Sequence, residues 1–399
     1  MEQVLYKLPD GWEWMQLGEA LDVRDGTHDS PKYVESGFPL ITSKNITGKG
    51  LDVQNVKYIS QEDFDAINKR SKVDVGDILF AMIGTIGFPT VITDEPNYAI
   101  KNVALFKKRQ DDQNMDFFKY FLESPYAIES MLAQAKGAAQ KFVGLKVLRS
   151  FNVPLPPKVE QKRIVEKLDA LLTRIDTAIE HLQESVKLAD TLYASVLNEL
   201  STGIDGEKIK LGKLGKIIRG SSPRPKGDPR YYGGSIPRLM VADVTRDGRY
   251  VTPAIDFLTE EGALKSRPVP KGTLTIQVSG NPGMPAILAV DACIHDGFAA
   301  LVEINRESIS AEYLYFSLLA VAEQNNQMAV GAIFRNLTTS QLREIEVIIP
   351  SYEKQLDVVS KMDMAEQKVK ALKAELKTQL DSIRQLKASI LDSAFKGEL

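Results

Sequence analysis

Cysteine and histidine are scarce in this 399-residue sequence, which contains one cysteine, Cys293, and three histidines. A single cysteine excludes an internal disulfide bond and cannot build the usual tetrahedral zinc site. His28, His181 and His295 stand in unrelated contexts, and the pair His295–Asp296 is more typical of a loop contact than of a catalytic dyad. The sequence therefore predicts no metal-binding residues.

Motifs that mark catalysis are also missing. The phosphate-binding pattern Gly-x-x-x-x-Gly-Lys-Ser/Thr does not occur, because Gly212 and Lys213 lack both the following hydroxyl residue and the upstream glycine. The Asn/Asp-Pro-Pro-aromatic tetrad of amino-methyltransferases is absent too, since residues 155–158 read Leu-Pro-Pro-Lys. We therefore expect no catalytic residue and no cofactor on this chain.

Long apolar runs are lacking as well. No uninterrupted stretch approaches the ~20 apolar residues that a membrane-spanning helix needs. The first residues, Met-Glu-Gln-Val, lack the basic and then apolar layout of a signal peptide. Together with the single cysteine, which suits a reducing compartment, these absences predict a cytoplasmic protein without membrane contact.

A strong excess of positive charge is the last absence. The formal net charge is −3 and the pI is about 5.9, whereas a nucleic-acid-binding domain is often strongly basic. Any contact with DNA must therefore use local clusters of cations or borrow charge from a partner.

Two long stretches lack proline and glycine, and they reveal a repeat. Each stretch follows an apolar and proline-rich segment, the first near residue 153 and the second near residue 347. Pro156 and Pro350, Gln161 and Gln355, and Gly203 and Gly397 are each 194 residues apart. A constant offset of this kind indicates a tandem duplication.

Both stretches carry apolar residues at heptad spacing, which predicts two long helices that pair with each other. A helix of about 40–45 residues spans roughly 60–65 Å and cannot lie inside one domain of ~150 residues. We expect the helices to run antiparallel. Their predicted buried residues are Leu168, Leu171, Ile175, Leu182, Leu192, Val196, Met362, Val369, Leu372, Leu376, Ile383, Leu386 and Ile390.

The segments before the two helices are mixed in character. Residues 38–41 and 75–83 read as buried strands, and residues 116–136 carry helical periodicity. The prediction is an α+β protein with two mixed α/β domains, related by a pseudo-two-fold axis and separated by two long antiparallel coiled-coil helices. Its expected parts are domain 1 at 1–155, a central helix at 156–203, domain 2 at 204–349 and a C-terminal helix at 350–399.

Loops of the two domains carry the residues that could bind DNA. The loop at residues 219–230 has four cations against one aspartate, which favours phosphate contact. Gly137 to Lys141 and Gly331 to Arg335 both join a glycine to a cation, and Asn, Lys and Asp can pair with base edges. The candidate residues are Thr27, His28, Ser30, Lys32, Ser43, Lys44, Asn45, Thr85, Lys101, Asn102, Gln140, Lys141, Ser221, Ser222, Arg224, Lys226, Arg230, Asp243, Asn281, His295, Arg335 and Asn336.

The ordered set of repeated motifs resembles the specificity subunit of type I restriction–modification systems. Each domain opens near Leu-Gly, at Leu17 and at Leu211, and has a Gly-Asp-Ile-Leu strand entry at Gly76 or its variant at Gly272. The first domain ends in Pro-Leu-Pro-Pro followed by Glu-Gln-Lys-Arg-Ile-Val. The second copy of this junction is weaker, with Ser351 in place of the second proline.

The resemblance implies that each domain is a target recognition domain for one half of a split DNA sequence. It implies that the helices set the half-site spacing and dock two methyltransferase subunits, which would hold S-adenosylmethionine. Up to two restriction and translocase subunits, with ATP and magnesium, would join for cleavage. None of this catalysis would reside on the present chain.

Two other functions were weighed against this one. A two-headed protein-interaction scaffold without DNA binding would need an apolar or aromatic contact loop, and the loop at 219–230 is cationic. An enzyme with an unrecognised site between the domains is the third possibility, and methyl transfer by the isolated chain would support it.

Overall fold

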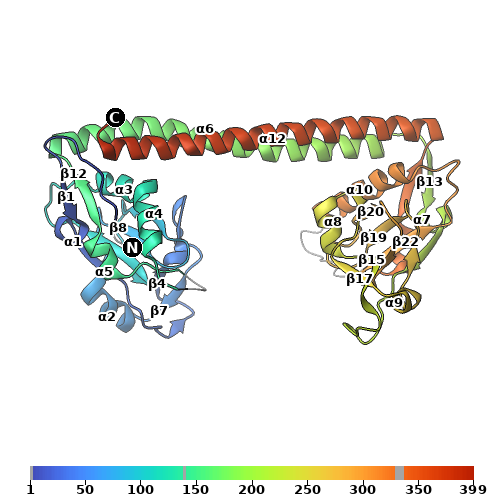
Figure 1. Ribbon diagram of the computed structural model, residues 1–399, viewed down its shortest axis with the longest axis horizontal. Helices are drawn as coiled ribbons and strands as arrows, with labels where there is room; N and C mark the ends of the chain where they lie inside the picture. The colour runs from blue at the N-terminus through green and yellow to red at the C-terminus, as the bar shows by residue number, and fades with distance from the viewer. Residues whose placement is uncertain (1–2, 138–140, 329–336) are drawn as a thin grey trace. The chain divides into compact units, whose positions relative to one another are not determined.

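The computed structural model describes residues 3–137, 141–328 and 337–399. The chain forms two compact units. Unit 1 consists of Met1–Gln183 and Thr378–Leu399, and unit 2 consists of Glu184–Lys377. Each unit therefore contains one mixed domain and a part of each long helix (Figure 1).

The elements of unit 1 alternate short strands and short helices before the first long helix. They are β1 (Glu13–Gln16), α1 (Leu17–Ala20), β2 (Asp22–Asp25), β3 (Tyr33–Val34), β4 (Phe38–Thr42), the 3-10 turn η1 (Ser43–Asn45), β5 (Ile46–Thr47), β6 (Gly50–Leu51), β7 (Lys57–Ile59), α2 (Gln61–Ser71), β8 (Ile78–Ala81), β9 (Gly87–Val91), β10 (Ala99–Lys101), β11 (Val103–Lys107), α3 (Met115–Glu123), α4 (Pro125–Gln134), α5 (Leu145–Ser150), β12 (Asn152–Leu155) and α6 (Lys158–Thr202).

Unit 2 repeats this order with small changes. Its elements are β13 (Glu207–Lys210), α7 (Leu211–Leu214), β14 (Lys216–Arg219), β15 (Tyr232–Leu239), α8 (Val241–Asp247), β16 (Tyr250–Val251), β17 (Asp256–Leu258), α9 (Glu260–Lys265), β18 (Pro268–Val269), β19 (Leu274–Gln277), β20 (Pro285–Leu288), β21 (Ala292–Ile294), β22 (Phe298–Val302), α10 (Ala311–Met328), α11 (Thr339–Glu344), β23 (Glu346–Ile349) and α12 (Tyr352–Lys396).

Each domain is built on a central sheet, which is antiparallel apart from the parallel pair β16–β20 in unit 2, and on a second, mixed sheet. In unit 1 the central strand order is β2-β11-β8-β9 and the second sheet is β10-β4-β7-β3. In unit 2 the corresponding orders are β14-β22-β19-β20-β16 and β17-β15-β21-β18. A short two-stranded ladder, β1-β12 or β13-β23, closes each domain next to its long helix. The predicted α+β class and the internal repeat are confirmed.

The helices α3 and α4 lie between the central sheet of unit 1 and the parts of the long helices in this unit (Figure 1), and their apolar side chains belong to its buried core. Phe117 and Phe121 are fully buried, and both rings meet Phe395 near the end of α12 at centroid distances of 5.3 Å. Burial of large aromatic rings contributes much of a domain's stability. The long helices therefore belong to the hydrophobic core and are not free linkers.

The long helices run antiparallel within each unit, as the sequence predicted. In unit 1, Lys387 Nζ lies 2.6 Å from the Asp176 carboxylate, and Arg163 donates a hydrogen bond of 2.7 Å to the Leu399 carbonyl. In unit 2, Lys373 Nζ lies 2.7 Å from the Asp190 carboxylate.

The predicted heptad register was wrong for four leucines. Leu171, Leu192, Leu372 and Leu386 were expected in the helix-pair core, but they are 37, 57, 42 and 51% exposed. The second row of α6 that faces inward lies one residue later, where Leu172 is buried and Ile179, Val186, Tyr193 and Leu200 are half-buried.

Heptad spacing alone could not decide this register. Positions i+3 and i+4 both lie on the same face of a helix, and α6 has leucine at both 171 and 172. Leu172 is buried because it also faces the core of the mixed domain of unit 1. Of the other predicted core residues, Leu168, Ile175, Met362 and Leu376 are buried, and Leu182, Val196, Val369, Ile383 and Ile390 are half-buried.

Candidate nucleic-acid interface

Loops of unit 1 converge at one end of its central sheet. The strands β2, β11, β8 and β9 are successive antiparallel neighbours. The end of β2, the start of β11, the end of β8 and the start of β9 therefore lie at the same end of the sheet, which is called its loop edge. The loops at this edge contain residues 26–32, Asn102 and residues 83–86. Loops at a sheet end are positioned by a rigid scaffold and often carry binding residues.

The loop after β2 lies directly beside the start of β11. The Thr27 amide donates to the Ile100 carbonyl, and the Asn102 amide donates to the Thr27 carbonyl at 3.1 Å. Lys101 Nζ hydrogen-bonds the Ser30 hydroxyl, and the Ser43 hydroxyl donates to the Asn102 carbonyl at 2.8 Å. Tertiary structure thus brings together five predicted residues from three separate segments.

A buried carboxylate holds this cluster in place. Asp25 is buried, and its two oxygens contact Arg70 Nη2 at 2.5 Å and His28 Nε2 at 2.9 Å. His28 Nδ1 lies 2.8 Å from the Asn102 side-chain oxygen. The exposed rim, which includes Lys32, surrounds a hollow of about 660 Å³ that also reaches α2. Asp25 and Arg70 were not predicted, because neither lies in a motif and their pairing joins distant segments.

The hairpin between β8 and β9 brings a second predicted group to the same edge. The Gly84 amide donates to the Lys141 carbonyl at 2.9 Å, so Lys141 stands next to exposed Thr85. Gln140 lies outside the described residues.

Two predicted base readers are engaged in local structure. Asn45 is buried, accepts the Thr42 amide at 3.0 Å and donates to two backbone carbonyls. Asp243 in unit 2 is completely buried, and its carboxylate accepts hydrogen bonds from the amides of Met240 and Ala254, each at 3.0 Å. Both side chains anchor the turn after an equivalent strand, and a base contact would require these hydrogen bonds to break. Lys44, beside Asn45, is exposed.

In unit 2 the equivalent end of the central sheet carries different residues. The end of β14, the start of β22, the end of β19 and the start of β20 meet there. Gly220 follows β14, and a Cβ atom at this glycine would stand only 2.0 Å from the His295 carbonyl oxygen. The close approach of the two loops therefore requires glycine.

The cationic loop of unit 2 is held by one acidic residue. Arg219 Nε donates to the Asp296 carbonyl at 2.8 Å. The Ser222 hydroxyl donates to the Asp296 carboxylate at 2.8 Å, and this bond is the main cause of a lowered Asp296 pKa. The Arg224 guanidinium lies 3.6 Å from the same carboxylate and is 72% exposed. Arg224 is therefore ordered but still open to solvent.

A buried arginine supports this loop from behind. Arg238 pairs with Asp256, donates to the Ser222 hydroxyl at 3.2 Å and lies over the Tyr232 ring. Arg238 has no recognisable signal in the sequence, because an isolated arginine in a strand does not reveal its partner.

The remaining predicted residues of unit 2 differ in their side-chain contacts and exposure. Arg230 forms an ion pair of 2.7 Å with Asp228, whereas Lys226 is exposed. Ser221 shares its loop with both, and its hydroxyl donates to the Lys265 carbonyl at 3.2 Å. Asn281 lies in the exposed turn between β19 and β20. Arg335 and Asn336 lie outside the described residues.

His295 is mostly inside the domain. Its ring packs edge-on against Phe298, and its Nδ1 accepts the Gly297 amide at 2.7 Å. Burial lowers the pKa of His295, and the hydrogen bond to Asp296 opposes that shift only in part. The neutral imidazole is therefore the form that fits this position.

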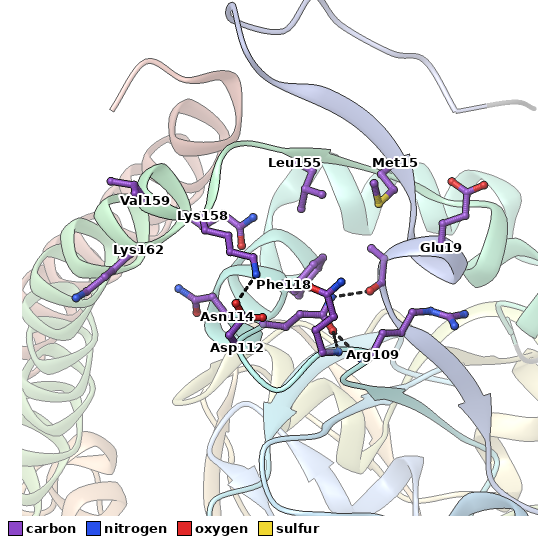
Figure 2. A pocket seen from close by; sticks show the side chains of 14 residues that line it. Met15, Glu19, Arg109, Asp112, Asn114, Phe118, Leu155, Lys158, Val159 and Lys162 are labelled. Carbon is purple, nitrogen blue, oxygen red and sulfur yellow. Dashed lines mark hydrogen bonds and ion pairs between the residues drawn. The ribbon is translucent and has the colours of Figure 1, made fainter.

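A separate pocket of about 570 Å³ lies at the start of α6, at the other end of the central sheet (Figure 2). Met15, Phe118 and Leu155 line it with apolar atoms, and Lys158 reaches Asp112 across its mouth. In unit 2, fully buried Gln355, the residue equivalent to Gln161 of this pocket, bonds the backbone of both Ser308 and Ser310. This pocket belongs to the junction with the helix and contains none of the predicted DNA-binding residues.

In residues 3–137, 141–328 and 337–399, no group of three or more His, Cys, Asp or Glu side chains could hold a metal ion. Over the same ranges, no helix is long and apolar enough to cross a membrane.

Comparison with known proteins gives a consistent result over the whole chain. The family model of the type I restriction modification DNA specificity domain matches twice, at residues 9–188 and 204–382. The putative type I restriction enzyme MjaX specificity subunit of Methanocaldococcus jannaschii is 24% identical over 420 residues, which cover 98% of this chain and 95% of that protein. The type I restriction enzyme EcoBI specificity subunit of Escherichia coli is 24% identical over 355 residues, with 81% and 73% covered.

Solved structures share the fold. A chain from a study of complex assembly and conformational transition of the type I R-M system superimposes with a TM-score of 0.76 at 22% identity, covering 99% of this chain and 100% of that one. The HsdS subunit from Thermoanaerobacter tengcongensis gives a TM-score of 0.54 at 23% identity, with both chains covered completely.

Proposed function

Because the chain belongs to the family of type I restriction–modification DNA specificity subunits, we propose that its two units each read one half of a bipartite, asymmetric DNA site. The functional parts are residues 1–155 and 204–349 as recognition domains, and residues 156–203 and 350–399 as spacer helices. We assign the protein to the cytoplasm, where its DNA lies.

The observation that carries the proposal is that loops gather at the equivalent end of the central sheet in each unit. In both units, the loops that hold the predicted residues meet at the equivalent end of equivalent strands. The shared scaffold gives both units the same way of presenting loops to a duplex. The loops themselves differ, so the two half-sites should differ in sequence.

The two edges suit different contacts. Unit 2 presents Arg224 and Lys226, which favour phosphates and guanine edges. Unit 1 presents Lys101, Asn102 and His28, and His28 also lines a hollow, which suits hydrogen bonding to base edges and the neighbouring backbone. Low net charge is compatible with this function because few cations contact the duplex directly and partners add others.

We further propose that the long helices dock two methyltransferase subunits and set the distance between the half-sites. The exposed leucines support this assignment. Leu188, Leu192 and Leu372 form an apolar stretch on the helices of unit 2, and Leu171 and Leu386 are exposed in unit 1. Leu192 and Leu386 occupy the same position of the repeat, so each unit would offer an equivalent docking residue.

Catalysis and its cofactors are assigned to partners. The methyltransferase subunits would bind S-adenosylmethionine and methylate adenine, and up to two restriction and translocase subunits would use ATP and magnesium. This chain would contribute the choice of sequence.

Binding to a bipartite duplex tests the proposal. The target is first mapped by locating methylated adenines in genomic DNA. A gel shift with the chain and its methyltransferase, at two salt concentrations, should then show preference for the mapped duplex and weakening with salt. Equal affinity for a duplex with scrambled half-sites would refute sequence recognition. Addition of one heptad to both long helices should change the preferred spacer or abolish assembly.

A further inference from the structure

An exposed aromatic residue lies at the end of the central sheet of unit 1 where the candidate loops gather. Phe142 is 38% exposed, whereas the next residue, Val143, is completely buried in the core. Side chains alternate along an extended segment, so the Phe142 ring points out of the domain where Val143 points in. The candidate residues of the interface did not include Phe142, because one phenylalanine after a loop has no signature of its own.

The backbone of Phe142 is fixed on both sides. Its amide donates to the Lys136 carbonyl at 2.8 Å, and its carbonyl accepts the Lys136 amide at 2.9 Å. On the other side Phe142 pairs with Ile83, through hydrogen bonds from Gly84 to Lys141 and from Val143 to Met82. The ring is thus presented by a short ladder attached to the end of β8.

A cation lies beside this ring. Phe142 and Lys136 exchange both backbone hydrogen bonds, and residues paired in this way carry their side chains on the same face. Lys141 precedes Phe142 and, by the alternation of an extended segment, lies on the other face; both lysines are exposed. An exposed aromatic ring beside a cation is an arrangement with which proteins stack an unpaired base while contacting the backbone phosphates.

We propose that Phe142, with Lys136 on the same face, is a stacking platform for a nucleobase that leaves the helical stack in the half-site read by unit 1. This inference rests on the proposed function. Lys136 would hold a phosphate beside the displaced base, and the ring would cover the face of that base. Unit 2 uses a cationic loop at the equivalent edge, so only one half-site would be deformed in this way.

Fluorescence of 2-aminopurine tests the platform. The full chain with its methyltransferase is bound to the mapped duplex, in which single bases of the unit 1 half-site are replaced by 2-aminopurine in turn. Unmethylatable analogues of the target adenine are used, so that base displacement by the methyltransferase at its own adenine is identified and set aside. We expect a fluorescence change at one further position, and Phe142→Ala should abolish it.

Affinity provides the second readout. Phe142→Ala should weaken binding of the mapped duplex between about fivefold and about a hundredfold, the range produced by loss of one base–aromatic stack. Phe142→Trp should retain binding. Phe88→Ala is the matched control, because Phe88 is 40% exposed in the same hairpin but its ring lies against Gly48.

The outcomes separate the two proposals. Failure of the wild-type complex to prefer the mapped duplex overturns the proposed function itself. Sequence-specific binding with no further 2-aminopurine change, or with the same change in Phe142→Ala, overturns the platform and leaves the function intact. Equal losses for Phe142→Ala and Phe88→Ala also overturn the assignment to Phe142.

Discussion

Arg249 Nη1 lies 2.6 Å from the Asp363 carboxylate and ties the second recognition domain to helix α12. The guanidinium also stacks near Tyr250 and Phe316 and is largely buried. Asp169, the residue equivalent to Asp363 in the repeat, accepts the Tyr120 hydroxyl in unit 1. The same carboxylate therefore joins helix to domain in both units, through a different donor in each.

Replacement of Asp363 should loosen unit 2. Asp363→Ala leaves a mostly buried guanidinium without its nearest acceptor, so we expect a loss of about 1–3 kcal/mol in the free energy of unfolding. Thermal unfolding and hydrogen exchange of the helices would measure it. Glu366→Ala is the matched control, because Glu366 lies 3.6 Å from Arg249 and is half exposed. Equal effects of the two variants would contradict a specific role for Asp363.

The corrected helix register makes a simple prediction. Leu172 is 3% exposed and Leu171 is 37% exposed. Leu172→Ala should reduce the stability of unit 1 by about 2–5 kcal/mol, the usual range for a buried leucine. Leu171→Ala should change it by less than about 1 kcal/mol. Chemical denaturation of both variants compares them directly, and a reversed order would restore the register expected from heptad spacing.

The exposed leucines should be needed for assembly and not for folding. A glutamate at such a position places charge in an interface that we expect to be apolar. Leu192→Glu and Leu386→Glu should each remove one methyltransferase from the complex, and the double variant should remove both. Native mass spectrometry counts the bound subunits. Leu264→Glu is the control, because Leu264 is 86% exposed on α9, outside the helix pair; full assembly of both single variants would refute the docking role.

Arg224 should contribute a phosphate contact. Arg224→Gln should weaken binding to specific and scrambled duplexes alike and lower the slope of log affinity against log salt by about 0.9. Filter binding at several salt concentrations gives the slope. Arg306→Gln serves as control, because exposed Arg306 bonds the Gly272 carbonyl at the opposite end of the sheet. If Arg306→Gln has the larger effect, the DNA lies at the other edge.

His295 should make unit 2 sensitive to acid. Burial lowers its pKa in the folded state, so below the ordinary value of about 6.5 the unfolded chain binds a proton more readily than the folded chain. The stability that neutral His295 gives to unit 2 is therefore fully present above this pH and is lost as the pH falls through the folded-state pKa. The charged groups that face His295 are Asp296, Asp256 and Arg238.

Denaturation curves between pH 5 and 8 would test this dependence. His295→Asn, which keeps an acceptor for the Gly297 amide, should flatten the stability profile over that range. His181→Asn, an exposed change on α6, should leave the profile of the wild type. A profile for His295→Asn that still falls with acid would show that another group is responsible.

The repeat, the α+β class and the antiparallel helices were open to prediction from the sequence by itself. Glycine, proline and heptad positions recur at a fixed offset, because the backbone of both copies needs the same turns and the same apolar stripes. The candidate loop residues of the interface also come from the sequence, since turn formers and clustered cations are visible in the chain, and their role in DNA binding stays a prediction.

Tertiary structure decided which of these residues act together. Leu172 rather than Leu171 is buried because α6 faces a recognition domain as well as α12, and spacing along one helix contains no information about that domain. Asn45 and Asp243 turned out to hold backbone turns. The pairs Asp25–Arg70 and Arg238–Asp256, and the exposed ring of Phe142, depend on strands brought together by folding, so only the folded chain could reveal them.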